Sequence, residues 1–344
     1  MIPTVSLALQ GGGSHGAFSW GVLDRLLQEV VDGRLALAAI SGTSAGALNA
    51  ALVVAGLAQG GPSLARQKLE AFWRAVSRQG TLAGNDLFFA EPSVFGFNLD
   101  YSPVGIALEA AGLVVSPYTN PFYSDGLAPL LAQAFTAGDL AAVNAGTPLF
   151  ITATNVTTNA RRVFTQPGVT LDTLRASAAL PSLFRAVTIE GEPYWDGGYL
   201  GNPALGPLLP HADDLLLVLV NAFHRHGMPP KSARRILDRL NEITFNASVV
   251  LELNAIEAIN RLLGELAAAG TAYAGRYRPI RPHAIRNDAF VESLGFVSKG
   301  ATSWGFLSAL HDAGHQTADQ WLRVHEGDLG RRATFDAKAE LALL

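Results

Sequence analysis

The sequence contains no cysteine, and this absence excludes several classes of protein. Without a thiol there is no disulfide framework, no thiolate metal site and no cysteine nucleophile, although such a chain can fold in either redox compartment. Charged residues are also scarce, at 16% of the 344 residues. The net charge of −4 and the lack of a long Lys/Arg cluster give no support to nucleic-acid binding.

Long apolar runs are missing as well. No stretch approaches the roughly 18 apolar residues that would cross a bilayer. Residues 1–9 have no basic flank, and Gly11 interrupts them before they reach the length of a signal-peptide core. We therefore expect a soluble, cytoplasmic protein, and the sequence leaves open a peripheral contact with membranes.

Apolar residues are nevertheless abundant overall, at 49% of the chain. Such a share can bury a substantial core and excludes a disordered protein. The length suits one large domain or two ordinary ones. Because we find no internal repeat and no convincing linker, we predict a single domain over residues 1–344. Its motif-bearing α/β core would span residues 5–220, and a helical C-terminal portion residues 221–344.

The first part of the chain alternates between strand-like and helix-like patterns. Residues 5–9 and 35–41 are short apolar runs of the kind that form buried strands. Between them, Phe18, Val22 and Leu26 recur every four residues, as they would on one face of a helix. A second helix-like run follows the second strand. This alternation predicts a right-handed crossover and a parallel sheet.

The later chain is expected to add strands and long helices. Strands are predicted at residues 149–156, 162–165, 187–189, 193–195 and 215–221, and helices at residues 171–179 and 303–325. Residues 80–121 lack periodicity, so we expect an extended insertion over the sheet. An apolar stripe at helical spacing, with polar residues such as Asn246 opposite, predicts a core-packing helix; the stripe consists of Phe245, Val249, Leu253, Ile256, Ile259 and Leu263.

The most informative motif is Gly42-Thr43-Ser44-Ala45-Gly46, which lies between a predicted strand and a predicted helix. On such a sharp turn the serine hydroxyl stands clear of the backbone, and the glycines let strand and helix approach closely. The pattern favours a nucleophilic serine. The alternative is a small residue that packs where a helix meets the sheet.

A glycine loop, Gly11 to Gly16, follows the first strand and precedes the first helix. Backbone N–H groups at such a helix start can stabilise a phosphate or the oxyanion of acyl transfer. The loop also matches the dinucleotide fingerprint G-x-G-x-x-G. A dinucleotide site usually has a carboxylate at the end of the second strand, and none stands at residues 40–44, which disfavours a dehydrogenase. A tight turn without a ligand is the remaining alternative.

The third motif is Asp196-Gly197-Gly198, directly after an apolar strand. Asp-Gly is a common turn dipeptide, so an ordinary turn is one interpretation. Combined with an exposed serine, the carboxylate could instead accept the hydroxyl proton during attack, with no histidine between them.

Together these motifs resemble the signatures of the patatin-like phospholipase family. The resemblance rests on Gly11 to Gly16, Gly42 to Gly46 and Asp196 to Gly198 in this order, and residues 176–184 resemble the segment before the family's aspartate. It covers roughly residues 5–220 and is specific as a set. It implies a three-layer α/β/α fold with a mostly parallel central sheet, and a lipid acyl hydrolase of the phospholipase A or lysophospholipase type.

The resemblance also assigns roles to residues. Ser44 would be the nucleophile and Asp196 the base. The backbone of Gly11, Gly12 and Gly13 would form the oxyanion hole. Five further glycines would support these motifs: Gly16, Gly42, Gly46, Gly197 and Gly198. The partner is a lipid or another acyl ester, and no metal or organic cofactor is implied.

Two positions depart from the family pattern. His15 stands where the family commonly has Arg or Lys, and Arg185 stands where it often has proline. His311 and His315 have the i, i+4 spacing of a metal pair, but no glutamate completes an H-E-x-x-H motif, so a zinc site is disfavoured.

Three other functions stay open. An acyltransferase would share the acyl-enzyme and differ only in its acceptor. A non-catalytic lipid-binding protein would keep the fold without turnover. An α/β-hydrolase with a Ser-His-Asp triad would need an essential histidine.

Overall fold

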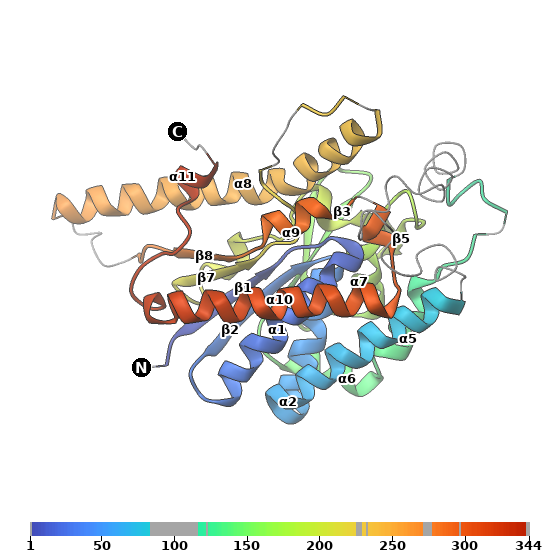
Figure 1. Ribbon diagram of the computed structural model, residues 1–344, viewed down its shortest axis with the longest axis horizontal. Helices are drawn as coiled ribbons and strands as arrows, with labels where there is room; N and C mark the ends of the chain where they lie inside the picture. The colour runs from blue at the N-terminus through green and yellow to red at the C-terminus, as the bar shows by residue number, and fades with distance from the viewer. Residues whose placement is uncertain are drawn as a thin grey trace.

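An eight-stranded sheet organises the described part of the chain (Figure 1). The computed structural model describes residues 2–82, 116–121, 123–224, 229–231, 233–270, 277–295 and 297–341. The strands are β1 (Thr4–Leu9), β2 (Ala36–Thr43), β3 (Leu149–Asn155), β4 (Arg161–Thr165), β5 (Val187–Ile189), β6 (Glu192–Asp196), β7 (Asp214–Val218) and β8 (Arg281–Ile285). Their order in the sheet is β5-β6-β3-β2-β1-β7-β8, with β4 also paired to β3.

The sheet is mixed. β3, β2, β1, β7 and β8 run parallel, as the alternating pattern predicted for β1 and β2. The pairs β3–β4, β3–β6 and β5–β6 are antiparallel. β1 lies between β2 and β7 and is buried from Val5 to Leu9, which explains why this stretch is apolar except for Ser6.

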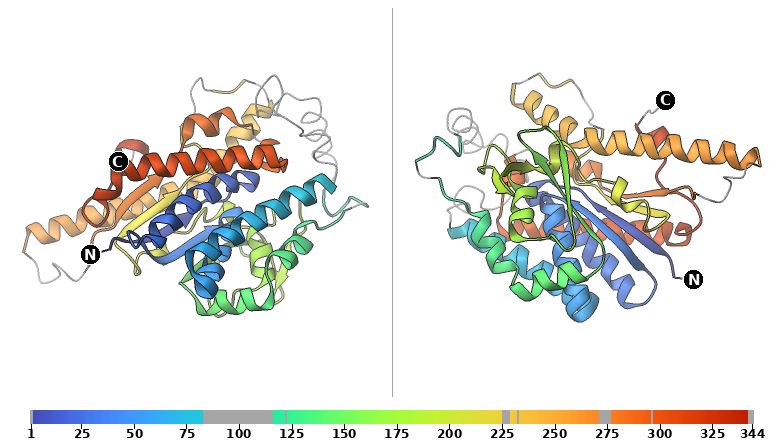
Figure 2. Two further views of the ribbon diagram at one scale, coloured as in Figure 1. Left: turned by 60° about the horizontal axis from the view of Figure 1, so that its bottom comes forward. Right: turned by 180° about the vertical axis from the view of Figure 1, so that it is seen from behind.

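Helices cover both faces of the sheet (Figures 1 and 2). Successive residues of β7 belong in turn to two apolar clusters on opposite faces of the sheet. Leu216 and Val218 are part of the first cluster, and Leu215 and Leu217 are part of the second. The first cluster packs against α1 (Gly16–Val31), α2 (Ala45–Leu82), α5 (Leu127–Ala134), α6 (Ala137–Ala145), α7 (Leu171–Ala178) and α10 (Trp304–His325). The second packs against α8 (Ala233–Ala268) and α11 (Ala337–Leu341). The fold is therefore the predicted three-layer α/β/α arrangement.

The C-terminal portion is built into the sheet and its cover. α10 lies beside α1 (Figure 1). The two helices can approach closely because Gly21 and Gly314 have no side chains, and an added methyl group at either position would overlap the other helix. The prediction of a helical portion is right for α8, α9 (Asp288–Ser293), α10 and α11. It missed β8, an edge strand that pairs with β7.

The helix-like run predicted after the second strand is part of a long helix. α2 continues to Leu82, with a break at Gly60 and Gly61 before Pro62. By length and composition alone, residues 45–80 could cross a membrane, but more than half of the qualifying window is buried inside the protein. This is typical of a core helix. Most of the insertion predicted at residues 80–121 lies outside the described residues.

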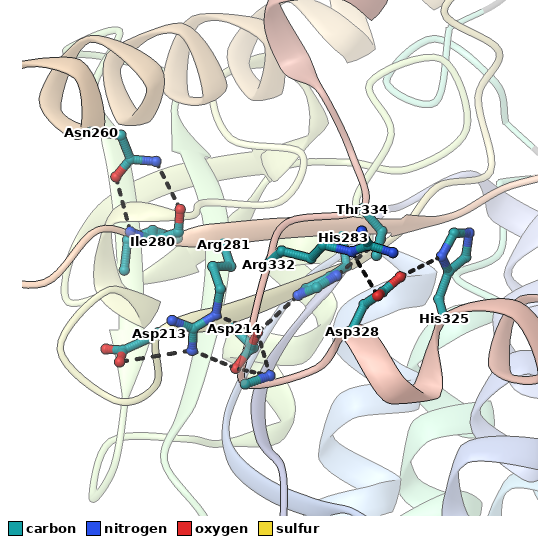
Figure 3. A network of polar contacts seen from close by, with 11 residues as sticks. Asp213, Asp214, Asn260, Ile280, Arg281, His283, His325, Asp328, Arg332 and Thr334 are labelled. Atoms are coloured by element: carbon teal, nitrogen blue, oxygen red, sulfur yellow. Dashed lines mark hydrogen bonds and ion pairs between the residues drawn. The ribbon is translucent and has the colours of Figure 1, made fainter. Parts of the chain in front are cut away.

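A polar network ties the start of β7 and β8 to the C-terminal segment (Figure 3). Asp214 accepts hydrogen bonds from Arg281 at 2.8 and 2.9 Å, and its Oδ1 lies 2.9 Å from His283 Nε2. Gly330 N–H also donates to this carboxylate. Burial alone would raise the pKa of Asp214, but the hydrogen bonds from Arg281 and His283 outweigh it and hold the pKa below its ordinary range. The network lies at the end of the parallel strands opposite the predicted motifs.

The long helix α8 packs with part of the predicted stripe. Phe245, Val249, Leu253 and Ile256 are buried, whereas Ile259 is 50% exposed, and in Figure 1 the end of α8 extends beyond the sheet. The prediction that Asn246 faces away from the core is wrong. Asn246 is buried and accepts a hydrogen bond of 2.8 Å from Gln10 Nε2, so a polar contact replaces apolar packing there.

Candidate active site

β2 and β6 meet end to end on one edge of β3. Ser44 directly follows β2, and Asp196 is the last residue of β6. Thr43, the last residue of β2, pairs with Thr152, and Asp196, the last residue of β6, pairs with Ala153. β4 occupies the other edge of β3 at these positions. β2 and β6 therefore run toward each other on the same edge, and the register brings Ser44 and Asp196 together.

Ser44 has the backbone of a sharp turn. Its φ is +54°, in the left-handed region that side chains other than glycine rarely adopt. Ser177 from α7 supports this conformation: its Oγ accepts a 3.0 Å hydrogen bond from Ser44 N–H and donates a 2.7 Å bond to Thr152 C=O. Such strain is typical of a nucleophile held away from its own backbone.

Asp196 is fully buried, and its backbone and one carboxyl oxygen are fixed. Its N–H donates to Ala179 C=O at 2.9 Å, its C=O accepts from Thr154 Oγ1 at 2.9 Å, and its Oδ1 accepts from Gly198 N–H at 2.7 Å. Ala179 belongs to the segment that resembled the family motif before the aspartate. That segment therefore sets the position of the carboxyl group.

The second oxygen of Asp196, Oδ2, is buried and accepts no hydrogen bond of ordinary geometry from any described residue. Burial raises the pKa of Asp196 to about 7. Gly198 N–H, the nearby Ser44 hydroxyl and the Lys299 ammonium all act in the opposite direction. A carboxyl group with this pKa is suited to exchange protons near neutral pH.

One of the three backbone N–H groups predicted for an oxyanion hole is hydrogen-bonded within the protein. Gly11 N–H donates to Asn202 Oδ1 at 2.7 Å, so this donor is already used. Among the described residues, neither Gly12 nor Gly13 N–H has an acceptor. Gly13 has a φ of +58°, which a residue with a side chain would rarely adopt. Gly11 instead makes room, because an added Cβ would lie 2.7 Å from Ser44 Cβ.

The five supporting glycines all lie at close contacts. At each position an added methyl group would overlap a neighbouring atom. The neighbours belong to the motifs themselves or to elements packed on them: Ala45 at Gly16, Gly46 at Gly42, Leu9 at Gly46, Thr152 at Gly197 and Phe245 at Gly198. Small residues are thus needed where the loop, the serine turn and the aspartate turn pack together.

The two departures from the family pattern have different surroundings. His15 is buried, its Nε2 lies 2.7 Å from Ser298 Oγ, and burial together with Lys299 lowers its pKa to about 3. It is therefore neutral near pH 7. Arg185 lies at the surface, where its N–H donates to the Tyr123 hydroxyl and its Nε to Pro117 C=O.

The histidine pair of α10 faces a carboxylate that is already paired. His311 and His315 lie 3.8 and 4.0 Å from Asp24 Oδ2, but Arg66 binds both oxygens of Asp24. No group of three possible metal ligands occurs in the part of the chain that the structure describes. His226 lies outside the described residues.

Sequence reasoning missed three residues that support the site. Ser177 lay in a segment noted only for its resemblance, and its contact with Ser44 N–H gives that segment a physical role. Asn202 and Lys299 lie outside the motifs and carry no local pattern. An isolated buried asparagine or a half-buried lysine is recognisable only from its partners in space.

A family model described as patatin-like phospholipase matches residues 7–209, more than half of the chain. The chain belongs to this family. The match includes all three motifs, and lipid hydrolysis is the activity that membership of the family supports. No curated protein matches the sequence closely enough to count as a relative.

Two solved structures share low sequence identity with this patatin-like chain. VipD from Legionella pneumophila is 15% identical, with a TM-score of 0.41, and the alignment covers 94% of this chain and 67% of VipD. A chain from the complex of full-length SpcU with full-length ExoU, of the type III secretion system of Pseudomonas aeruginosa, is 16% identical with a TM-score of 0.31. That alignment covers 94% of this chain but about half, 53%, of the other. Both superpositions are too loose to transfer the roles of residues.

Proposed function

We propose that this patatin-like protein is a serine acyl hydrolase of lipids, of the phospholipase A or lysophospholipase type, that works through a Ser44–Asp196 dyad. The observation that carries the proposal is the end-to-end meeting of β2 and β6 beside the Gly12 and Gly13 N–H groups, for which no described residue is an acceptor. A nucleophile, a proton acceptor and an oxyanion site are the three parts that acyl transfer requires.

In the first half-reaction, Ser44 Oγ attacks the ester carbonyl carbon while its proton moves to Asp196 Oδ2. The carbonyl oxygen becomes an oxyanion and accepts hydrogen bonds from Gly12 and Gly13 N–H. When the intermediate collapses, the bond to the leaving alcohol breaks, and the alcohol takes the proton from Asp196. Ser44 now carries the acyl group.

In the second half-reaction, water attacks the acyl-enzyme and gives a proton to Asp196. The second tetrahedral intermediate uses the same two N–H donors. Its collapse releases the fatty acid, and Ser44 Oγ regains the proton. Asp196 thus acts in turn as base and acid, which suits a carboxyl group with a pKa of about 7.

The test is labelling with a fluorophosphonate followed by assays on phospholipid, lysophospholipid and glyceride esters. We expect the label on Ser44 and no hydrolysis by Ser44→Ala or Asp196→Asn. Ser182→Ala, at an exposed serine of the neighbouring motif, should keep full activity. Full activity of Ser44→Ala on every ester would contradict the proposal.

The same assays separate the alternatives. Release of free fatty acid indicates hydrolysis, whereas transfer to an added alcohol indicates an acyltransferase. Labelling of Ser44 would argue against a purely lipid-binding role. Of the described histidines, His15 is the one that lies within the glycine loop, so a Ser-His-Asp triad would be favoured only if His15→Gln lost all activity.

Contact with a lipid surface is part of the same proposal. α8 exposes aliphatic side chains, among them Leu240 at 53% and Leu251 at 68% exposure, and its buried side contributes Phe245 to the site. An exposed apolar helix face adjoining the site would suit an enzyme that takes its substrate from a membrane surface.

A further inference from the structure

We propose that Lys299, from the C-terminal portion, is the positioning cation of the active site, and that it favours the ionised form of Asp196 that the attack by Ser44 needs. This inference rests on the proposed dyad and adds a residue that lies beyond the family-matched segment. Because His15 is neutral, the glycine loop itself carries no positive side chain. Lys299 would supply a positive charge next to the loop.

The backbone brings Lys299 against the glycine loop. The short helix η5 (Val297–Gly300) packs on η1 (Gly13–His15). An added Cβ on Gly13 would lie 2.5 Å from Lys299 C=O and 3.5 Å from Lys299 Cβ. Gly13 therefore permits an approach that any larger residue would prevent, and the lysine side chain begins directly beside the loop.

The lysine side chain reaches between the glycine loop and the aspartate turn. Lys299 Nζ donates a 2.8 Å hydrogen bond to Asn221 Oδ1, and Asn221 Nδ2 donates a 3.0 Å bond to Gly11 C=O. Nζ also lies 5.6 Å from the centre of the Phe245 ring. That ring packs on Gly198, whose N–H holds Asp196. One ammonium group is thus linked to both halves of the site.

The charge of Lys299 acts on both buried titratable groups there. It lowers the pKa of Asp196 against the larger effect of burial, and it adds to the burial that lowers the pKa of His15. Tyr199 is neutral, because burial and Asp196 raise its pKa to about 12. Arg161, beside Gly201, is paired with Glu252. Among the described residues, Lys299 is the cation with a direct electrostatic effect on Asp196.

Removing this charge should disfavour the ionised form of Asp196, because a nearby positive charge stabilises a carboxylate. The acid limb of the pH–rate profile, where activity is lost as Asp196 takes up a proton, should then move to higher pH. A single positive charge that acts on a buried carboxyl group supports a shift of about one pH unit. Below the midpoint, the rate should fall about tenfold, and it should recover at high pH.

The experiment measures the second-order rate of fluorophosphonate labelling of Ser44, and kcat/KM for ester hydrolysis, from about pH 5 to about pH 9. Lys299→Met and Lys299→Gln remove the charge, whereas Lys299→Arg keeps it. Lys338→Met removes the charge of an exposed lysine and is the matched control. We expect the acid limb to move up by about one pH unit in the Met and Gln variants only. Thermal unfolding checks that each variant is folded.

An unchanged midpoint in both charge-removing variants would overturn the role of Lys299, even if their rates fell equally at every pH. Lys299→Arg must keep the wild-type midpoint, because the midpoint would not follow the charge at residue 299 if the lysine were merely structural. If wild-type Ser44 is not labelled at all, the proposed dyad fails. If Ser44 is labelled but the midpoint of the acid limb is the same in all variants of residue 299, only the inference about Lys299 fails.

Discussion

Burial of the Asp196 carboxyl group should cost folding stability in a pH-dependent way. Asp196→Asn removes the ionisable group and keeps the Oδ1 acceptor for Gly198 N–H. The pKa of Asp196 rises from its ordinary 3.8 to about 7 in the folded protein. Since one pKa unit corresponds to about 1.4 kcal/mol, ionising this group in the folded state costs about 4 kcal/mol relative to the unfolded chain.

The sign follows from proton binding. Between about pH 4 and about pH 7 the folded protein holds a proton on Asp196 that the unfolded chain has lost, so the stability of the wild type falls as the pH rises. Below this range both states are protonated, and the effect vanishes. Asp196→Asn lacks this contribution. Its stability relative to the wild type should therefore increase by about 4 kcal/mol from about pH 4 to about pH 8.

Urea unfolding of both proteins, followed by circular dichroism across this pH range, measures the difference directly. Asp172→Asn, at an exposed aspartate, is the control and should follow the wild type closely. Parallel stability curves for wild type and Asp196→Asn from about pH 4 to about pH 8 would refute the reasoning, because Asp196 would then ionise alike in both states.

Three further predictions concern the serine turn, its support and the helix surface. Ser44→Gly should be about 1 kcal/mol more stable than Ser44→Ala in urea unfolding, because only glycine relieves the strain of a φ of +54°; equal stabilities would argue against strain. Asn202→Ala leaves Gly11 N–H buried without its partner, so unfolding should show a loss of about 1–3 kcal/mol and kcat should fall; a neutral result would mean that the contact is dispensable. Leu240→Glu and Leu251→Glu should weaken sedimentation with phosphatidylcholine vesicles but spare hydrolysis of a short soluble ester; unchanged sedimentation would exclude α8 as the lipid contact.

Much of the fold was predictable because its signals are local. Mostly apolar runs gave β1 and β2 to within two residues, since parallel strands buried on both faces are rich in apolar residues. The turn around Ser44 and the Asp-Gly-Gly turn were likewise readable from neighbouring glycines. Their meeting could be inferred only from the family resemblance, because the register of β6 on β3 leaves no local trace.

The rest depended on contacts between distant segments. β8 was missed because Arg281-Pro-His-Ala-Ile is neither an apolar run nor a clean alternation, and β7 pairs with it all the same. Asn246 was assigned to the solvent side by helical period, but its partner Gln10 is buried with it. Lys299 has no sequence signature, since its relation to Asp196 arises from packing of η5 on the glycine loop.

The position of β1 in the sheet indicates whether the family-matched segment could fold without the rest of the chain. Residues 7–209 end before β7, yet β7 is the strand that covers one side of β1. A fragment cut at that boundary would open the middle of the sheet and expose an unpaired apolar strand, which invites association with other copies. We therefore expect a fragment of residues 7–209 to aggregate or stay unfolded, although the family match ends there.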